Sequence, residues 1–316
     1  MRIATHASDI DGIVSAALIL MKYPSAKIDF LTLRDIRNMF DVDYDLVVDL
    51  PKLPKAKVNI DHHISNYEKL VKEKRLTEND IVDPKAPSAA SLIINYLDLS
   101  DNKRAKELVD FANIADTGGV NKKIYMLDKI IKCHSNEPNV LLKIAWILVE
   151  RGLNFDKDEW IKNEWKRLKK WLDKGKKISE KVAKSALKKG VKYLIVDLVA
   201  GFPRLSMSDV QWNFINRGGK VIILVNRMKE MDPVCPKIIK FPNDNTVRIS
   251  LRVAKDCEFN GKQLAERLGG GGHIRAAGAR FFIHEYPRAL KIMFEELAKY
   301  GIVGYIKVHV NLDADR

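Results

Sequence analysis

Aspartate and histidine residues recur in the first 120 positions, most of them directly after short apolar runs. They are His6, Asp9, Asp11, Asp49, Asp61, His62, His63 and, at the end of a helical pattern, Asp116. Carboxylates gathered in one crevice repel one another unless cations neutralise them, so this set predicts a metal site rather than a bare acid/base pair. Mixed aspartate and histidine ligands suit Mn²⁺, Mg²⁺ or Zn²⁺ and leave room for two ions.

The apolar runs that precede these residues predict the elements that position them. Runs at 3–5, 28–33, 46–48 and 58–60 alternate with helical patterns such as 13–21, which indicates a largely parallel sheet in an α/β domain. Loops at the carboxyl ends of such strands converge on one crevice. A single aspartate there is ordinarily a turn former or a helix cap, as Asp9 could be, but the whole set disfavours that reading.

Helical patterns continue over 88–97, 103–115 and 140–150, and a basic stretch at 158–189 predicts a long connecting helix. Residues 160–190 include twelve Lys or Arg and three acidic residues, a surplus of nine. We favour a packed apolar face with solvated lysines opposite, with contact to nucleic acid as the alternative. The apolar positions are Trp160, Trp165, Leu168, Trp171, Leu172, Ile178 and Val182.

A second alternation of strands and helices predicts a smaller α/β domain after this helix. Strands are expected at 193–199, 221–225 and 246–253, with helices near 208–216, 261–268 and 287–300 and a last strand at 279–283. The expected organisation is a first domain over 1–157, a connecting helix over 158–190, and a second domain over 191–316.

The composition is that of a globular protein with acidic partners. The net charge of +14 usually accompanies nucleic acid or nucleotide ligands. Neither a signal peptide nor a run of about 18 apolar residues is evident, so we expect a cytoplasmic protein without a membrane partner.

Residues 269–278, GGGGHIRAAG, are a second candidate site. Consecutive glycines give a flexible backbone that an anion or a sugar can approach closely. The segment lacks the Lys-Ser/Thr pair of a Walker loop, and no strand precedes it as in a dinucleotide fingerprint. A plain glycine linker is the alternative, which His273 and Arg275 disfavour.

Four segments resemble, in order and placement, the motifs of the DHH phosphoesterase family. They are THASDIDG at 5–12, VVD at 47–49, DHH at 61–63 and ADTGG at 115–119. Residues 269–278 resemble the GGGH motif of the DHH-associated C-terminal domain, and RISLR at 248–252 resembles its Ser-x-Arg strand. The resemblance covers nearly the whole chain.

The resemblance implies two divalent cations, commonly Mn²⁺, with Mg²⁺ or Co²⁺ as alternatives. Asp49 would bridge the ions, with His6 and Asp9 on one and Asp11, His62 and Asp116 on the other. Because two residues separate His6 from Asp9 and this spacing varies among relatives, Ser8 or water is an alternative ligand. His63 would face the phosphate and Asp61 would orient its neighbours. The implied substrate-binding residues are Ser250, Arg252, Gly270, Gly271, Gly272, His273 and Arg275.

The activity implied is hydrolysis of a phosphodiester by a metal-bound hydroxide that attacks phosphorus in line. The second domain would bind a terminal nucleotide across the interdomain cleft, so the expected substrates are short single-stranded RNA or DNA, or dinucleotides. The alternatives are a cyclic-dinucleotide phosphodiesterase and a RecJ-like exonuclease on longer chains, which the short chain disfavours. A pyrophosphatase and a non-catalytic nucleic-acid-binding protein are less favoured, and a homo-oligomer is compatible with the sequence.

Overall fold

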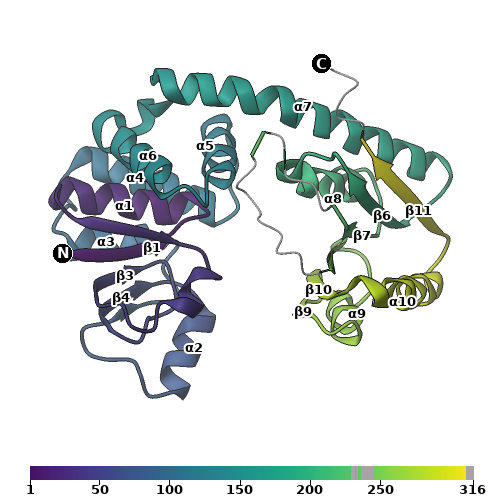
Figure 1. Cartoon of the computed structure of the whole chain (residues 1–316), viewed down its shortest axis with the longest axis horizontal. Coiled ribbons are helices and arrows are strands. Elements are labelled where there is room, and N and C mark those ends of the chain that lie inside the picture. Colours follow the sequence, from purple (N-terminus) through teal and green to yellow (C-terminus); the bar gives the residue numbers. More distant parts are fainter. Residues whose placement is uncertain (229–231, 233, 236–244, 311–316) are drawn as a thin grey trace. The chain divides into compact units, whose positions relative to one another are not determined.

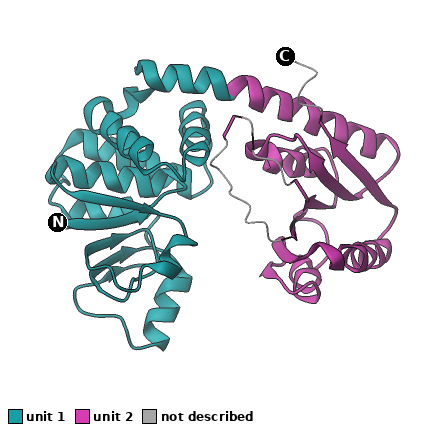
Figure 2. Cartoon of the chain, viewed as in Figure 1, with its two compact units in different colours: residues 1–168 teal, residues 169–316 magenta. Residues whose placement is uncertain are grey.

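The computed structural model describes residues 1–228, 232, 234–235 and 245–310, and the chain divides into two compact units (Figure 2). The first unit comprises residues 1–168 and the second residues 169–316. The long helix α7 (Glu159–Lys188) begins in the first unit and ends in the second, whereas the sequence predicts a separate connecting segment. Among the helices described, none is both long and apolar enough to span a bilayer.

The first unit is built on a five-stranded parallel sheet in the order β2-β1-β3-β4-β5, which confirms the predicted fold class (Figure 1). Its strands are β1 (Arg2–His6), β2 (Lys27–Leu31), β3 (Tyr44–Val48), β4 (Ala56–Asp61) and β5 (Ile81–Val82). Since β1, β3 and β4 are parallel neighbours, their carboxyl ends meet at one edge of the sheet.

Six α-helices complete this unit, and the helix that follows β1 lies at its centre. They are α1 (Ile10–Lys22), α2 (Ile64–Lys72), α3 (Ala89–Tyr96), α4 (Lys103–Asp116), α5 (Lys122–Cys133) and α6 (Pro138–Arg151). Short 3₁₀ turns lie at Asp35–Asn38 and Gly152–Lys157. Helix α1 is buried from Ile10 to Leu20 and packs beside α3, α4 and α6, as expected of a helix that is apolar on nearly every side.

The second unit contains a mixed six-stranded sheet in the order β11-β6-β7-β8-β10-β9. Its strands are β6 (Tyr193–Ala200), β7 (Val221–Asn226), β8 (Thr246–Val253), β9 (Gly271–His273), β10 (Ala276–Phe282) and β11 (Val303–His309). Its helices are α8 (Met207–Asn216), α9 (Gly261–Arg267) and α10 (Tyr286–Ala298), with 3₁₀ turns at Arg204–Ser206 and Ile283–Glu285.

Alternate strand residues of this second sheet enter two cores, one on each face. Ile195 and Ile223 pack with Met293 of α10 on one face. Leu194 packs with Phe214 of α8 on the other, where Val182 and its neighbours on α7 also lie. The apolar side of α7 is thus buried while lysines such as Lys170, Lys177 and Lys184 are exposed, in accord with the favoured reading of the basic helix.

The glycine-rich segment differs from its prediction. Residues 269–272 were expected to form a flexible connection before a strand at 279–283, but β9 is an edge strand and β10 begins at Ala276. The backbone pairing of Gly272 with Ala277 explains the difference, because ladder hydrogen bonds order a segment that glycine composition alone leaves free.

Gly12 allows α1 to begin directly against the end of β1. A Cβ atom at this position would lie 2.1 Å from the carbonyl oxygen of His6. Thr5 Oγ1 also donates a hydrogen bond of 2.9 Å to the carbonyl oxygen of Gly12. The absence of a side chain therefore fixes how closely the helix follows the strand.

Gly12→Ala should lower the free energy of unfolding by about 1–3 kcal/mol, because the added methyl group forces helix and strand apart. Urea unfolding measures this change. Ser15→Ala, one turn later on α1, is the matched control, since Ser15 Oγ is buried without a hydrogen-bond partner among the described residues. The control should change stability by less than about 0.5 kcal/mol or raise it. Equal losses in both variants would contradict the close-approach argument.

Candidate metal centre

The acidic and histidine residues singled out in the sequence meet at the carboxyl ends of β1, β3 and β4. In three groups, the candidate ligand atoms all lie within 4.8 Å of one another. The groups are His6, Asp9 and Asp49; Asp11, His62 and Asp116; and Asp49, Asp61, His62 and His63.

Asp49 belongs to the first group and also faces the second. Its Oδ2 atom is 3.6 Å from His6 Nδ1, and its Oδ1 atom is 3.7 Å from His62 Nε2. The residue follows β3 with φ of 55°, a left-handed conformation that aspartate tolerates better than most residues. Its backbone N–H donates to the carbonyl oxygen of Ile60 at 3.0 Å, so the strained turn is held by the neighbouring strand.

Two buried polar atoms of this site lack a hydrogen-bond partner in the described part of the chain. They are Asp49 Oδ2 and His62 Nε2. A buried donor or acceptor that is left unpaired costs about 1–3 kcal/mol, and more when it is charged. Divalent cations would satisfy both atoms, since each is a ligand type that such ions accept. The residues present therefore fit a metal centre.

Asp9 both caps a helix and reaches the site. Its Oδ1 atom accepts a hydrogen bond of 3.1 Å from the backbone of Gly12, which is the N-cap role that the sequence allowed. Its Oδ2 atom lies 2.6 Å from His6 Nδ1. Although burial opposes both shifts, this contact lowers the pKa of Asp9 and raises the pKa of His6.

Asp11 is held by the beginning of another helix, a role that the sequence does not reveal. Its two carboxylate oxygens accept hydrogen bonds from the backbone N–H groups of Ala89 at 2.7 Å and Ala90 at 2.8 Å. These are the first residues of α3, whose unpaired amides favour an anion. Burial nevertheless raises the pKa of Asp11 to about 7, and the charge of Asp9 adds to the shift.

Asp61 is fully buried and positions His63. Its Oδ1 atom accepts hydrogen bonds from His63 Nδ1 and from the backbone of His62, both at 2.8 Å. Its Oδ2 atom accepts from Asn66 Nδ2 at 2.7 Å, and Asn66 is linked in turn to the buried Asn59. Neither asparagine is among the site residues predicted from the sequence, although Asn59 interrupts an apolar strand and thereby signals a buried polar contact.

The remaining carboxylates have raised pKa values because they are buried and lie close to other charges. Burial raises the pKa of Asp49 well above its ordinary value, and repulsion from Asp11 and Asp9 adds to the shift. Burial likewise raises the pKa of Asp116, while His62 opposes that shift. In the absence of cations, protons are the alternative means of relieving this repulsion.

Comparison with known proteins identifies the fold. No model of a protein family and no curated protein sequence matches the chain. The solved structure of a pGpG-specific phosphodiesterase from Vibrio cholerae, PggH, has 15% identity and a TM-score of 0.63, and the match covers 94% of this chain and 99% of that one. RecJ from Thermus thermophilus in complex with Mn²⁺ has 15% identity and a TM-score of 0.54 over 97% of this chain and 54% of RecJ. The chain thus spans about half the length of that RecJ.

A third solved structure carries the family name. It is the DHH domain of a member of the s1p family of ribosomal proteins, with 15% identity and a TM-score of 0.52 over 95% of this chain and 87% of that one. The chain has the fold of the DHH phosphoesterases. At 15% identity this similarity shows the fold alone. The chemistry of the site must be argued from its side chains.

In the second unit of this DHH fold, the strand register brings Arg252 and His273 to one face. Both are level with Ala276 of β10, which lies between their strands. Ser250 and Gly271 form the next row of the same face, on either side of Gly278. Residues directly opposite one another in antiparallel strands point to the same side. The middle strand therefore presents only alanine and glycine between the arginine and the histidine.

Three further predicted residues have more specific positions. Gly272 has φ of 134°, and a Cβ atom there would lie 2.6 Å from the carbonyl oxygen of Ala276. Gly270 packs against the backbone of Gly278, where a Cβ would lie 2.1 Å from an oxygen atom. Arg275 turns away to donate a hydrogen bond of 2.9 Å to the carbonyl oxygen of Lys255. These residues shape the strand pair, whereas no atom lies within 4 Å of a Cβ built on Gly271, so that position is open.

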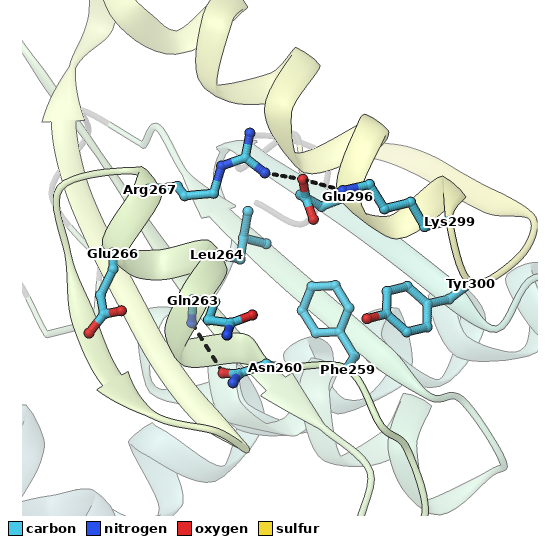
Figure 3. Close-up of a pocket in the computed structure, with 9 residues that line it drawn as sticks. All are labelled: Phe259, Asn260, Gln263, Leu264, Glu266, Arg267, Glu296, Lys299 and Tyr300. Carbon is cyan, nitrogen blue, oxygen red and sulfur yellow. Dashed lines mark hydrogen bonds and ion pairs between the residues drawn. The ribbon is translucent and has the colours of Figure 1, made fainter.

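The second unit of this DHH fold also contains a pocket of about 500 Å³ between α9 and the end of α10 (Figure 3). None of the predicted site residues lines it. Its Arg267 and Lys299 side chains both point to Glu296 and pair with it, so these charges satisfy one another (Figure 3). The volume of a pocket therefore does not by itself identify the candidate active site.

Without divalent cations, the protein should lose stability as the pH rises from about 5 to about 8. Asp11 has an ordinary pKa of 3.8 and a folded-state pKa of about 7, so in this range the folded state binds more protons than the unfolded chain. Stabilisation is thus complete below the ordinary pKa and is lost as the pH passes the folded value. The raised pKa values of His6 and His63 act in the same direction, whereas the lowered pKa of Asp9 acts at lower pH.

Thermal melting with EDTA over this pH range measures the effect, at about 2–4 °C for each kcal/mol lost. Saturating Mn²⁺ should remove the decline, because ionised ligands then face cations. A pH-independent melting temperature in EDTA would contradict the proton-binding account.

Proposed function

We propose that the chain is a two-metal phosphodiesterase that hydrolyses short single-stranded oligonucleotides or dinucleotides. The observation that carries the proposal is the position of Asp49, whose two oxygens face two separate groups of ligands that each include a histidine. The likeness in fold to a pGpG-specific phosphodiesterase and to a RecJ that binds Mn²⁺ supports the same class of reaction.

The first ion would be held by His6, Asp9 and Asp49, and the second by Asp11, His62, Asp116 and the other oxygen of Asp49. Mn²⁺ is the favoured ion, with Mg²⁺ and Co²⁺ as alternatives for this ligand set. When bound, two such ions supply Lewis-acid activation of water and of the phosphate oxygens. Asp61 is assigned a positioning role rather than a place in either ligand set, because its Oδ1 atom orients His63 and its Oδ2 atom accepts a hydrogen bond from Asn66.

We assign His63 as a hydrogen-bond donor to the phosphate. Its side chain is 52% exposed, and its Nδ1 atom is engaged by Asp61 at 2.8 Å, which leaves Nε2 available to a ligand. The hydrogen bond with Asp61 raises the pKa of His63, which favours the cationic form that donates from both nitrogens. A charged donor at this place stabilises the negative charge that develops on the phosphate oxygens.

The second unit would bind a phosphate of the same substrate, at a distance from the bond that breaks. Arg252 and His273 flank the bare strip of Ala276 and Gly278, where the side-chain donors of both residues can reach an anion. An arginine and a histidine at this face favour a substrate with more than one phosphate or nucleotide.

Asp49→Ala should reduce Mn²⁺-dependent hydrolysis of a dinucleotide by at least about 1000-fold, since the loss of a ligand shared by both ions disrupts the whole site. Asp45→Ala is the matched control, because Asp45 lies on the same strand but forms an exposed ion pair with Lys57. Steady-state kinetics and calorimetric titration of Mn²⁺ measure the outcome. Near-normal turnover in folded Asp49→Ala would refute the metal assignment.

Arg252→Ala and His273→Ala should each lower kcat/KM for oligonucleotides about 10- to 100-fold, which corresponds to the loss of a charged hydrogen bond. Mn²⁺ affinity should be unchanged, and hydrolysis of a small chromogenic phosphodiester should be nearly unchanged. Arg217→Ala, at the exposed end of α8, controls for the loss of positive charge. If both variants process dinucleotides and longer oligomers as the parent does, the second unit does not bind the substrate through this face.

A further inference from the structure

A pocket of about 240 Å³ adjoins the candidate metal centre within the first unit. One end is formed by Asp9, Asp11 and Asp116, which are three of the proposed metal ligands. The other end is formed by α5, a helix that the sequence analysis did not predict and that has no part in the proposed metal chemistry. Any group attached to a phosphate at the metal centre has this pocket beside it.

Helix α5 presents Tyr125, Asp128 and Lys132 to the pocket. Asp128 and Lys132 lie three and seven residues after Tyr125, so the three residues share one face of the helix. The Tyr125 ring packs edge to face against Trp165 with centroids 6.0 Å apart, and Lys129 Nζ lies 5.2 Å from its centroid. Such contacts fix the orientation of an aromatic ring before a ligand arrives.

The charges of the pocket disfavour a second phosphate. Four carboxylates line it, those of Asp9, Asp11, Asp116 and Asp128, against the single cation of Lys132. Three of these carboxylates face the proposed metal ions. The fourth, Asp128, pairs with Lys132 at 2.6 Å, so no net positive charge is left for an anion.

The remaining wall is apolar. Ile10, Ile124 and Val120 line the pocket together with the ring of Tyr125. Val120 is 73% exposed, so its side chain is accessible to a ligand in the pocket. A ligand that has apolar faces and a polar edge matches this arrangement, because its faces meet the ring and the aliphatic groups while its edge meets the Asp128–Lys132 pair.

We propose that this pocket binds the nucleobase of a nucleotide attached to the scissile phosphate, with Tyr125 as the principal contact. The inference rests on the proposed phosphodiesterase function and adds a specificity-determining site to it. A base is planar, aromatic and uncharged, and its edge carries donors and acceptors for a carboxylate and an ammonium group. Stacking of a base on an aromatic side chain is tolerant of sequence, so the pocket selects nucleotides over other phosphodiesters.

The test measures kcat/KM with Mn²⁺ for a dinucleotide and for two analogues that each lack one base. In the parent, removal of the base that occupies the pocket should lower kcat/KM roughly 5- to 150-fold, which corresponds to the usual effect of base stacking. Tyr125→Ala should cause a similar loss for substrates that retain this base. It should cause no further loss for the analogue that lacks it.

Two other variants control for packing. Tyr125→Leu keeps an apolar side chain beside Trp165 but removes the planar ring, so it should show the same base-dependent loss with a normal melting temperature. Tyr23→Ala removes a partly exposed tyrosine at the C-terminal end of α1, whereas the pocket lies at the N-terminal end of that helix. This variant should behave as the parent does. Equal losses on all three substrates, or no loss on any, would overturn the base-pocket assignment.

The failure of the proposed function can be recognised separately. If the parent hydrolyses none of the three substrates, the phosphodiesterase proposal is wrong, and the pocket is tested by binding instead. Calorimetric titration then uses a dinucleotide with a methylene group in place of the scissile bridging oxygen, together with its two base-free analogues. Weaker binding of one base-free analogue, and loss of that difference in Tyr125→Leu, would support the pocket; identical affinities would overturn it.

Discussion

The repulsion among five aspartates at one edge of a parallel sheet constrains the first unit more than any other interaction. Like charges this close in a poorly hydrated crevice interact strongly, and each must find donors, protons or cations. The fold supplies donors unequally. Asp61 has side-chain and backbone donors for both oxygens, and Asp11 has two amides of α3. Asp49 Oδ2 has no such donor among the described residues, and it lies where both ligand groups meet.

This unequal supply distinguishes the functions of carboxylates that look alike in the sequence. Asp61, whose oxygens orient His63 and accept a hydrogen bond from Asn66, is a positioning group. An aspartate with an oxygen left unsatisfied is prepared for an external cation. The second unit has the opposite electrostatic character, because its candidate site is an arginine and a histidine on a sheet face kept bare by small residues. The candidate cation site and the candidate anion-binding face therefore lie on different sheets.

Much of the fold follows from local sequence patterns. The apolar runs that predict β1, β3, β4 and β7 lie within the observed strands, because buried parallel strands need continuous aliphatic sequence. Helix α5 was missed because lysines and an aspartate interrupt its apolar positions in the segment KKIYMLDKIIKC. Strand β11 was missed because Gly304 and Lys307 interrupt it, and its position at the edge of the sheet tolerates both. The formation of α5 and β11 therefore depends on tertiary contacts more than on local sequence.

The candidate site was predictable to a similar degree. Residues at strand ends could be grouped because parallel strands bring their carboxyl ends together. The hydrogen bonds from α3 to Asp11 could not be predicted, because they join positions 78 and 79 residues apart. The same holds for the pairing that orders the glycine-rich segment, which depends on the register of β9 with β10 rather than on composition.

The left-handed backbone of Asp49 has a consequence for how this site can be altered. Only glycine, asparagine and aspartate adopt that conformation at low cost, so the position restricts replacement through the main chain as well as through the carboxylate. A replacement at this position would accordingly retain the fold most readily as asparagine or glycine, whereas a valine or isoleucine would disturb the end of β3. In a design library, these two substitutions would remove the proposed shared carboxylate and leave the course of the chain intact.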